Sequence, residues 1–265
     1  MKALSCIFIA IDDLAEGLKS WELWTSLGWN ELQKRFRRSV IGPLWMMLNL
    51  VIFVVALGFI YAEIMNQPLE IYIPHLVLGM AIWTFISSII MEGSRIYVSE
   101  GQILKQVNLP KSVFLYVLIW RNLIIFAYQF FVFILILALI EAPTITQWLF
   151  AILGFALTIA NCAWMGLLIA VVSARYHDVS EILGNILRIA FFITPIIWMP
   201  ASSLKHSVIT DFNPFYHLIE ITRAYLLGGV ATSASWIVAI ISCVAGWLLT
   251  LIIVGRYKNN ISFWI

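Results

Sequence analysis

Long uncharged apolar stretches, separated by shorter charged segments, dominate the sequence. Six of them approach the roughly 20 residues that an α-helix needs to cross the hydrocarbon core of a bilayer. The runs are Leu44–Ala62, Ile71–Met91, Leu123–Ile140, Trp148–Ala174, Ile189–Leu204 and Val230–Gly255. The helix that holds the third run is expected to begin near residue 113. This pattern predicts an all-α integral membrane protein with six transmembrane helices in a single domain, residues 1–265.

The fifth run, Ile189–Leu204, differs from the others. Its 16 residues would span about 24 Å as a helix, less than the roughly 30 Å of the hydrocarbon core, and it contains two prolines. The segment Ser202–Gly229 that follows includes an amphipathic stretch, Phe215–Leu227. Non-helical backbone at membrane depth is tolerated only where protein buries it or where it lines a water-filled cavity. We therefore expect re-entrant or interfacial helices at the outer mouth of a pathway, with a surface loop as the alternative.

The N-terminal segment predicts a helix in the membrane interface. The apolar run Leu4–Ile11 is short and ends at Asp12 and Asp13, so we interpret it as retained and not as a cleaved signal peptide. From there to Arg38, tryptophans and leucines recur at helical spacing among charged residues. We expect one interfacial helix over residues 12–38, with the aspartates at its N-cap.

Composition supports the membrane assignment, and the placement of charge suggests an orientation. Hydrophobic residues make up 62% and charged residues 11% of the chain, whereas soluble domains have about 45–50% and 25%. Most lysines and arginines fall in segments that six crossings would place on one side. They are Lys2, Lys19, Lys34, Arg35, Arg37, Arg38, Arg95, Lys105, Lys111, Arg121, Arg175, Arg188, Arg256 and Lys258. Only Lys205 and Arg223 fall on the other side. The positive-inside rule then predicts that both termini lie in the cytoplasm.

The sequence offers little bond-making chemistry. It has no Gly-x-x-x-x-Gly-Lys-Ser/Thr motif, so a motor that uses ATP would have to be a partner chain. The histidines and cysteines lack metal-ligand spacing, and we predict no catalytic, cofactor-binding or metal site and no nucleic-acid partner. Asp12 and Asp13 leave one alternative open, a membrane glycosyltransferase that holds a metal and a nucleotide-sugar.

Ionisable groups near the spans are scarce. Glu92 and Arg121 are each expected near the cytoplasmic end of a span, where a structural ion pair is favoured over a proton relay. Within the spans, Asn49, Gln129 and Asn161 can form hydrogen bonds between helices.

Two cytoplasmic connections and a set of aromatic rings are candidates for function. Arg95–Lys111 and Ala174–Arg188 combine charge with short amphipathic patterns and can dock a soluble partner, with solvated loops as the alternative. Aromatic residues collect toward the outer half of the spans, where their rings can stack on sugars or form an ordinary aromatic belt.

Four segments resemble the polysaccharide-export branch of the ABC-2 permeases. They are RFRRSVIGPLW (Arg35–Trp45), ARYHDVSEIL (Ala174–Leu183), FFITPIIWMP (Phe191–Pro200) and NPFYHLIEITRAYLLGG (Asn213–Gly229). The resemblance covers Glu31 to Tyr257. One departure is at Asn49, which many relatives follow with proline and this chain follows with Leu50.

The resemblance implies a transmembrane subunit in the bacterial cytoplasmic (inner) membrane. It would pair with a second copy of itself and with two copies of a cytoplasmic ABC ATPase, which uses ATP. Its substrate would be a lipid-linked polysaccharide (O-antigen, capsule or teichoic acid), with a drug or small-molecule exporter as the alternative.

The resemblance also implies site residues. ATPase coupling maps onto Gly101–Leu109 and Arg175–Glu181, namely Gly101, Gln102, Leu104, Lys105, Arg175, His177, Asp178 and Glu181. The polysaccharide channel draws on Phe53, Phe59, Tyr61, Phe192, Trp198, Phe215, Tyr216 and Tyr225. The outer gate falls on Asn213–Leu227.

Overall fold

A computed structural model describes residues 2–107, 109–138, 141–199 and 208–264. Within these ranges the regular secondary structure is helical, as predicted. Among the described residues, five helices are long and apolar enough to cross a membrane. They are α3 (Leu44–Ile64), α4 (Leu69–Gly93), α7 (Val113–Ile136), α8 (Ile145–Arg175) and α12 (Ser233–Tyr257). Each of these helices overlaps one of the apolar runs in the sequence.

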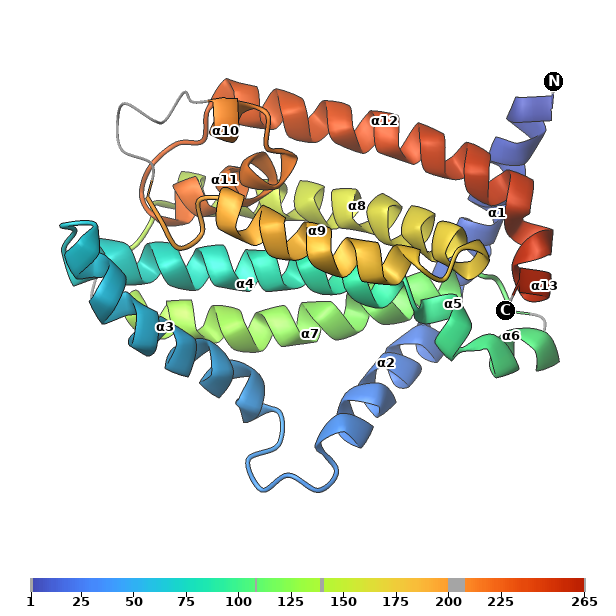
Figure 1. Ribbon diagram of the computed structural model, residues 1–265, viewed down its shortest axis with the longest axis horizontal. Coiled ribbons are helices and arrows are strands. Elements are labelled where there is room, and N and C mark those ends of the chain that lie inside the picture. The colour runs from blue at the N-terminus through green and yellow to red at the C-terminus, as the bar shows by residue number, and fades with distance from the viewer. Residues whose placement is uncertain (1, 108, 139–140, 200–207, 265) are drawn as a thin grey trace.

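The bundle is organised around α4, which is the most buried of the five long helices. It contacts α3, α7, α8 and the shorter α11 (Pro214–Leu226). Figure 1 shows α4, α7, α8 and α12 running side by side, whereas α3 and α2 (Trp21–Phe36) splay away from them in a V. Because α3 diverges, one face of α4 is left partly open.

Small residues allow close packing inside the bundle. A Cβ added to Gly93 on α4 would lie 3.1 Å from the carbonyl oxygen of Gly166 on α8. A Cβ added to Gly154 on α8 would overlap the backbone of Ile221 on α11. Such small contact residues are typical of membrane helix interfaces, where close backbone approach replaces the hydrophobic driving force.

Polar side chains define where several helices begin. Thr144 and Gln147 form a capping box at the start of α8. Asn213 accepts hydrogen bonds from the backbone N–H groups of Phe215 and Tyr216, and Pro214 occupies the first position of α11. Thr232 caps α12 in the same way.

The helix near the fifth apolar run differs from the prediction. Helix α9 covers Val179–Ile193, so it begins ten residues before the predicted run and ends within it. The end follows from the sequence, because Thr194 precedes Pro195 and the residue before proline is driven out of the helical region. Thr194 is extended, with ψ of 134°. At 15 residues, α9 falls short of a span, and residues 200–204 of the predicted run lie outside the described residues.

The N-terminal prediction of one helix over 12–38 is wrong. Two helices occupy this region, α1 (Lys2–Lys19) and α2, with a break at Ser20. The apolar run that precedes Asp12 is part of α1, which packs against α12. The aspartates therefore lie within a helix and not at its N-cap.

The short helices gather at the two ends of the bundle (Figure 1). At one end are α5 (Ile96–Ser99), α6 (Gly101–Gln106), the 3-10 helix η1 (Lys258–Asn260) and α13 (Ile261–Trp264). At the other end are α10 (Val208–Asp211) and α11. The predicted gate segment Asn213–Leu227 thus forms a helix, α11, next to α8.

Candidate functional site

A groove follows the open face of α4. The groove is a cavity of about 590 Å³ that is open to the outside and lies between α4, α9 and Phe53 of α3. The α4 side contributes the hydroxyls of Thr84, Ser87 and Ser88, and the groove also holds aromatic rings and charged side chains. Its lining residues are Phe53, Met80, Trp83, Thr84, Ser87, Ser88, Met91, Glu92, Gly184, Leu187, Arg188 and Phe191. We call this cavity and its lining the α4 groove.

A second cavity, of about 320 Å³, continues the α4 groove toward α7. The two cavities share Phe53, Met80, Thr84, Ser88 and Glu92, and the second adds Arg35, Asn49 and Gln129 among others. The side-chain oxygen of Gln129 is buried and has no hydrogen-bond partner among the described residues. An oxygen left unpaired beside a cavity can bind water or a polar ligand. The combined space is therefore mixed in character, with hydroxyls and amides between apolar rings.

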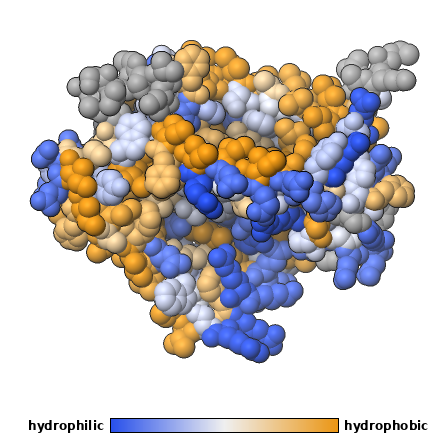
Figure 2. Space-filling model, viewed as in Figure 1, coloured by the Kyte–Doolittle hydropathy of each residue, from blue (hydrophilic) through white to orange (hydrophobic). Residues whose placement is uncertain are grey.

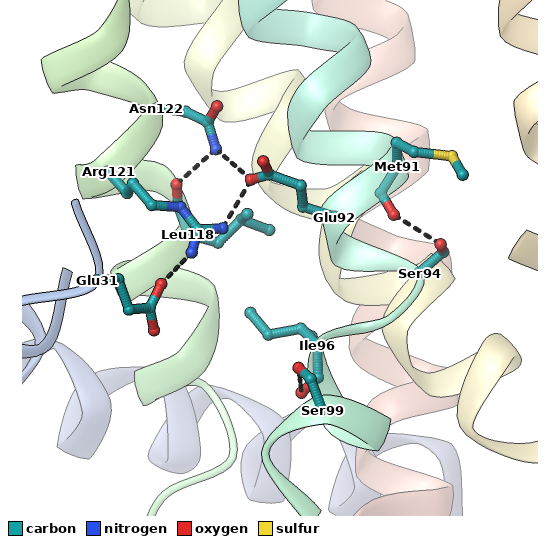
Figure 3. A network of polar contacts seen from close by, with 9 residues as sticks. All are labelled: Glu31, Met91, Glu92, Ser94, Ile96, Ser99, Leu118, Arg121 and Asn122. Atoms are coloured by element: carbon teal, nitrogen blue, oxygen red, sulfur yellow. Dashed lines mark hydrogen bonds and ion pairs between the residues drawn. The ribbon is translucent and has the colours of Figure 1, made fainter. Parts of the chain in front are cut away.

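An ion-pair network closes the end of the groove near α5 (Figure 3). The predicted Glu92–Arg121 pair is confirmed, with 2.7 Å between Arg121 Nη2 and Glu92 Oε2. Arg121 also pairs with Glu31 of α2, which the sequence analysis did not identify. Asn122 donates a hydrogen bond of 3.0 Å to the same Glu92 oxygen. The network joins α2, α4 and α7.

One guanidinium faces two carboxylates in this network. Burial raises the pKa of Glu31 above its usual value, while the charge of Arg121 acts in the opposite direction. The negative charges of Glu100 and Glu92 raise the pKa of Glu31 further.

The first predicted coupling segment forms α6. Gln102 and Lys105 are exposed, whereas Gly101 and Leu104 are buried. Leu104 joins a cluster of buried apolar residues that includes Tyr97 and Phe114. Gly101 and Leu104 thus anchor α6 to the bundle, and Gln102 and Lys105 are accessible to a partner. Residue 108 of the predicted range Gly101–Leu109 lies outside the described residues.

The second predicted coupling segment lies between α8 and α9. Arg175, His177, Asp178 and Glu181 are all exposed there. Glu181 pairs with Arg95, which precedes α5, at 3.4 Å. The two segments predicted to contact a partner therefore lie next to each other on one end of the bundle.

Asp13 holds this end together from inside. Its carboxylate accepts hydrogen bonds from the backbone N–H groups of Lys111 and Ser112, at 3.0 and 2.9 Å. These groups lie at the N-terminus of α7, so a side chain of α1 caps α7. Lys258, directly after α12, pairs with the same carboxylate at 2.9 Å. Asp13 is 1% exposed, and Asp12 beside it is exposed.

This arrangement argues against the glycosyltransferase alternative. A metal held by adjacent aspartates needs free carboxylate oxygens, but both oxygens of Asp13 accept protein hydrogen bonds. The physical role of Asp13 is structural.

A buried arginine organises the opposite end. Arg223 of α11 is 2% exposed. It donates to the carbonyl oxygen of Pro195 at 2.7 Å and to His75 of α4 at 3.2 Å. Glu220 supplies its counter-charge at 2.7 Å. Arg223 thereby ties α11 to α4 and to the non-helical segment that follows α9.

Comparison with known proteins identifies the family. The family model described as ABC-2 type transporter matches residues 22–227, most of the described bundle. The chain belongs to the ABC-2 type transporter family. It is similar to an O-antigen export system permease protein RfbA of Myxococcus xanthus, with 24% identity over 207 residues, covering 76% of this chain and 79% of that protein. The permease of the same name from Klebsiella pneumoniae is 23% identical over 204 residues, covering 76% and 78% of the two chains.

Among the aromatic residues predicted to line a channel in this ABC-2 protein, only some reach the α4 groove. Phe53 lines it. Phe215 packs edge-on against Trp83, a groove residue, with ring centroids 5.6 Å apart. Phe59 and Phe192 are exposed. Tyr225 stacks on Phe150 and lines neither cavity.

The remaining predicted rings have other surroundings. Tyr216 is buried, Tyr61 is half-buried, and the indole N–H of Trp198 donates to the carbonyl oxygen of Phe192 at 3.0 Å.

Sequence reasoning missed the groove residues on α4. The apolar run Ile71–Met91 predicts only a transmembrane helix, and it contains the groove residues Trp83, Thr84, Ser87 and Ser88. The sequence does hold one signal, because three hydroxyl residues, Thr84, Ser87 and Ser88, fall within five positions of a largely apolar helix. Arg188 was counted only as a basic loop residue, although it lies on α9 and lines the groove.

Proposed function

We propose that this chain is the transmembrane subunit of an ATP-driven exporter that moves a lipid-linked polysaccharide, O-antigen-like or capsular, across the cytoplasmic membrane. It would act as a homodimer with two copies of a separate ATPase. Similarity over about three quarters of the chain to proteins named O-antigen export permeases carries this proposal. The protein itself would bind no cofactor and would perform no bond chemistry.

The α4 groove supports a sugar substrate. Flat rings can stack on sugar faces, and hydroxyls offer hydrogen bonds that are easily exchanged. Trp83 and Phe191 have ring centroids 5.8 Å apart in the groove wall, close to Thr84 and Ser87. A path for a moving polymer needs such weak, repeated contacts, because a few strong ones would hold the chain in place.

The path of the chain supports a sixth crossing. The C-terminal ends of α8 and α12 lie side by side, since Arg175 and Arg256 line one pocket. At the opposite end, Gln147 near the start of α8 donates to the carbonyl oxygen of Gly228, shortly before α12 begins. Between Arg175 and Gly228 the chain must therefore pass from one end of the bundle to the other. Helix α9 and the segment after it are the proposed sixth crossing, and α10 and α11 the proposed outer gate.

Two observations support the proposed partners. The exposed residues of α6 and of the α8–α9 connection form one accessible surface, linked by Arg95 and Glu181, which suits an ATPase in the cytoplasm. A row of exposed apolar side chains also runs along α9, formed by Ile182, Ile186, Ile189, Phe192 and Ile193. Figure 2 shows this orange row bordered by hydrophilic side chains. Such a face beside the α4 groove suits a second copy of the chain.

The test is a strain in which the gene is deleted and complemented. We expect deletion to remove the surface polysaccharide and the wild-type gene to restore it. The double variant Gln102→Ala, Lys105→Ala should be made and inserted normally but should restore little of the glycan. Unchanged surface polysaccharide in the deletion strain, together with increased sensitivity to drugs, would instead identify a small-molecule exporter.

A further inference from the structure

A second pocket lies away from the α4 groove, where α8 and α12 end. It has a volume of about 330 Å³. Val171 and Ile252 contribute to its apolar part, and Arg175, Arg256, Tyr257 and Trp264 to its polar part. The volume is within the range of roughly 300–1,000 Å³ that small-molecule sites occupy. Neither the proposed substrate path nor the proposed gate uses this pocket.

The chemistry of the pocket changes with depth. On each of its two helices, an aliphatic residue lies one turn before an arginine: Val171 before Arg175, and Ile252 before Arg256. One end of the pocket is therefore apolar, and the other, where both helices end, carries two positive charges. This order matches an amphiphile that lies along the helices with its charged group at the membrane surface.

The two guanidinium groups have no carboxylate partner within ion-pair distance among the described residues. They contact rings instead. The guanidinium carbon of Arg175 lies 5.4 Å from the ring centroid of Trp264, and that of Arg256 lies 5.6 Å from that of Tyr257. Cation–π contacts hold an arginine in place without neutralising its charge. Each helix C-terminus carries only about half a negative charge, so the pocket remains positive.

We propose that this pocket is a binding site for an anionic phospholipid. The phosphate lies between Arg175 and Arg256, Trp264 and Tyr257 flank the headgroup, and the acyl chains extend along Val171 and Ile252. Basic pockets between transmembrane helices on the cytoplasmic side bind anionic lipid headgroups in other membrane proteins. The site adjoins the α8–α9 connection, so a bound lipid would also fix the position of that segment. The proposal does not depend on the identity of the transported substrate.

The experiment measures lipid binding to the full chain in nanodiscs of phosphatidylethanolamine and phosphatidylglycerol. After transfer to detergent, native mass spectrometry gives the affinity of the retained phosphatidylglycerol. We expect the wild-type protein to retain phosphatidylglycerol in preference to phosphatidylethanolamine. Because each basic residue contributes about 1 kcal/mol to such binding, the double variant Arg175→Gln, Arg256→Gln should bind phosphatidylglycerol about thirtyfold more weakly.

Two further variants separate a built site from diffuse attraction. Arg37→Gln with Arg38→Gln removes the same charge from an exposed pair elsewhere and should leave the tight phosphatidylglycerol binding intact. Ile252→Trp keeps both arginines but fills the pocket, and should weaken binding. Equal losses in the two arginine double variants, or full binding in Ile252→Trp, would overturn the proposal. A deletion strain with normal surface glycan would overturn the proposed function and leave this site untouched.

Discussion

Asp13 and Lys258 form an ion pair of 2.9 Å that joins the N-terminal helix to the end of the last long helix. The two residues are almost the whole sequence apart. Asp13 also caps α7, and α7 follows α6 directly in the chain. The ion pair therefore fixes the start of α7, next to the α6 segment that is proposed to contact the ATPase. Lys111 extends the junction with a hydrogen bond of 3.1 Å from its ammonium group to Ser262.

Asp13→Asn is expected to destabilise the protein. The substitution removes the charge that Lys258 faces and leaves one backbone N–H of α7 without its acceptor, which costs about 1–3 kcal/mol. We expect a lower melting temperature in detergent. The matched control is Asp12→Asn, because Asp12 is adjacent but exposed, and it should melt like the wild type. Equal melting of the two variants would show that the junction contributes nothing.

The charge network at the end of the α4 groove predicts a pH dependence. The pKa of Glu31 is raised from 4.5 in the folded protein, so the folded state binds this proton more tightly than the unfolded chain does. Protonation of Glu31 therefore contributes fully to the free energy of unfolding below pH 4.5. This contribution is lost as the pH rises through the pKa of Glu31 in the folded protein. Relative to Glu31→Gln, the wild-type melting temperature should fall as the pH rises from 4.5 toward neutrality.

Glu22→Gln is the control for this series. Glu22 lies on the same helix, α2, and is exposed, so its substitution should leave the pH dependence of the wild type in place. If the difference in melting temperature between wild type and Glu31→Gln stays constant with pH, Glu31 is not the source of the pH dependence.

Gly93→Val should weaken the contact between α4 and α8. A side chain at this position meets the backbone of Gly166, which cannot rotate away as a flexible side chain would. Overpacking of this kind costs about 1–3 kcal/mol, and thermal unfolding of the purified protein measures it. The comparison is Gly184→Ala on α9, where the nearest atom to an added Cβ is 3.6 Å away in Met91. That variant should be at least as stable as wild type.

Gly184→Trp tests the α4 groove itself. Gly184 lines the groove, so a tryptophan there narrows the path without disturbing a close helix contact. We expect surface polysaccharide to fall by at least about tenfold, the effect of some 1.4 kcal/mol on a rate, while protein level and melting temperature stay normal. Leu153→Trp, on an exposed position of α8, should export normally. Full export in Gly184→Trp would place the substrate path elsewhere.

The long helices could be predicted because each depends on a local property of the sequence. An uncharged run of sufficient length must be helical in lipid, and capping residues such as Thr144 and Thr232 mark where two of the helices begin. The Glu92–Arg121 pair could also be predicted, because two isolated charges near the same membrane face have few other partners.

The remainder depends on tertiary contacts. A search for uncharged runs stops at Arg188, but α9 continues through this residue because its charge faces the α4 groove. The sequence predicted Asp13 as the N-cap of the helix that it begins. Asp13 does cap a helix, but that helix is α7, about 100 residues further along the chain. Glu31 was missed for the same reason, since its partner Arg121 lies 90 positions away. Local sequence patterns do not predict contacts between residues that are so far apart in the chain.

The central claim is that this chain forms a path for a polysaccharide that an external ATPase drives. The most direct measurement reconstitutes the purified chain with its ATPase in vesicles and follows ATP-dependent movement of lipid-linked polysaccharide across the bilayer. We predict transport that requires both proteins and ATP and that Gly184→Trp lowers by at least about tenfold. Equal transport without the ATPase, or nucleotide hydrolysis by this chain alone, would contradict the account.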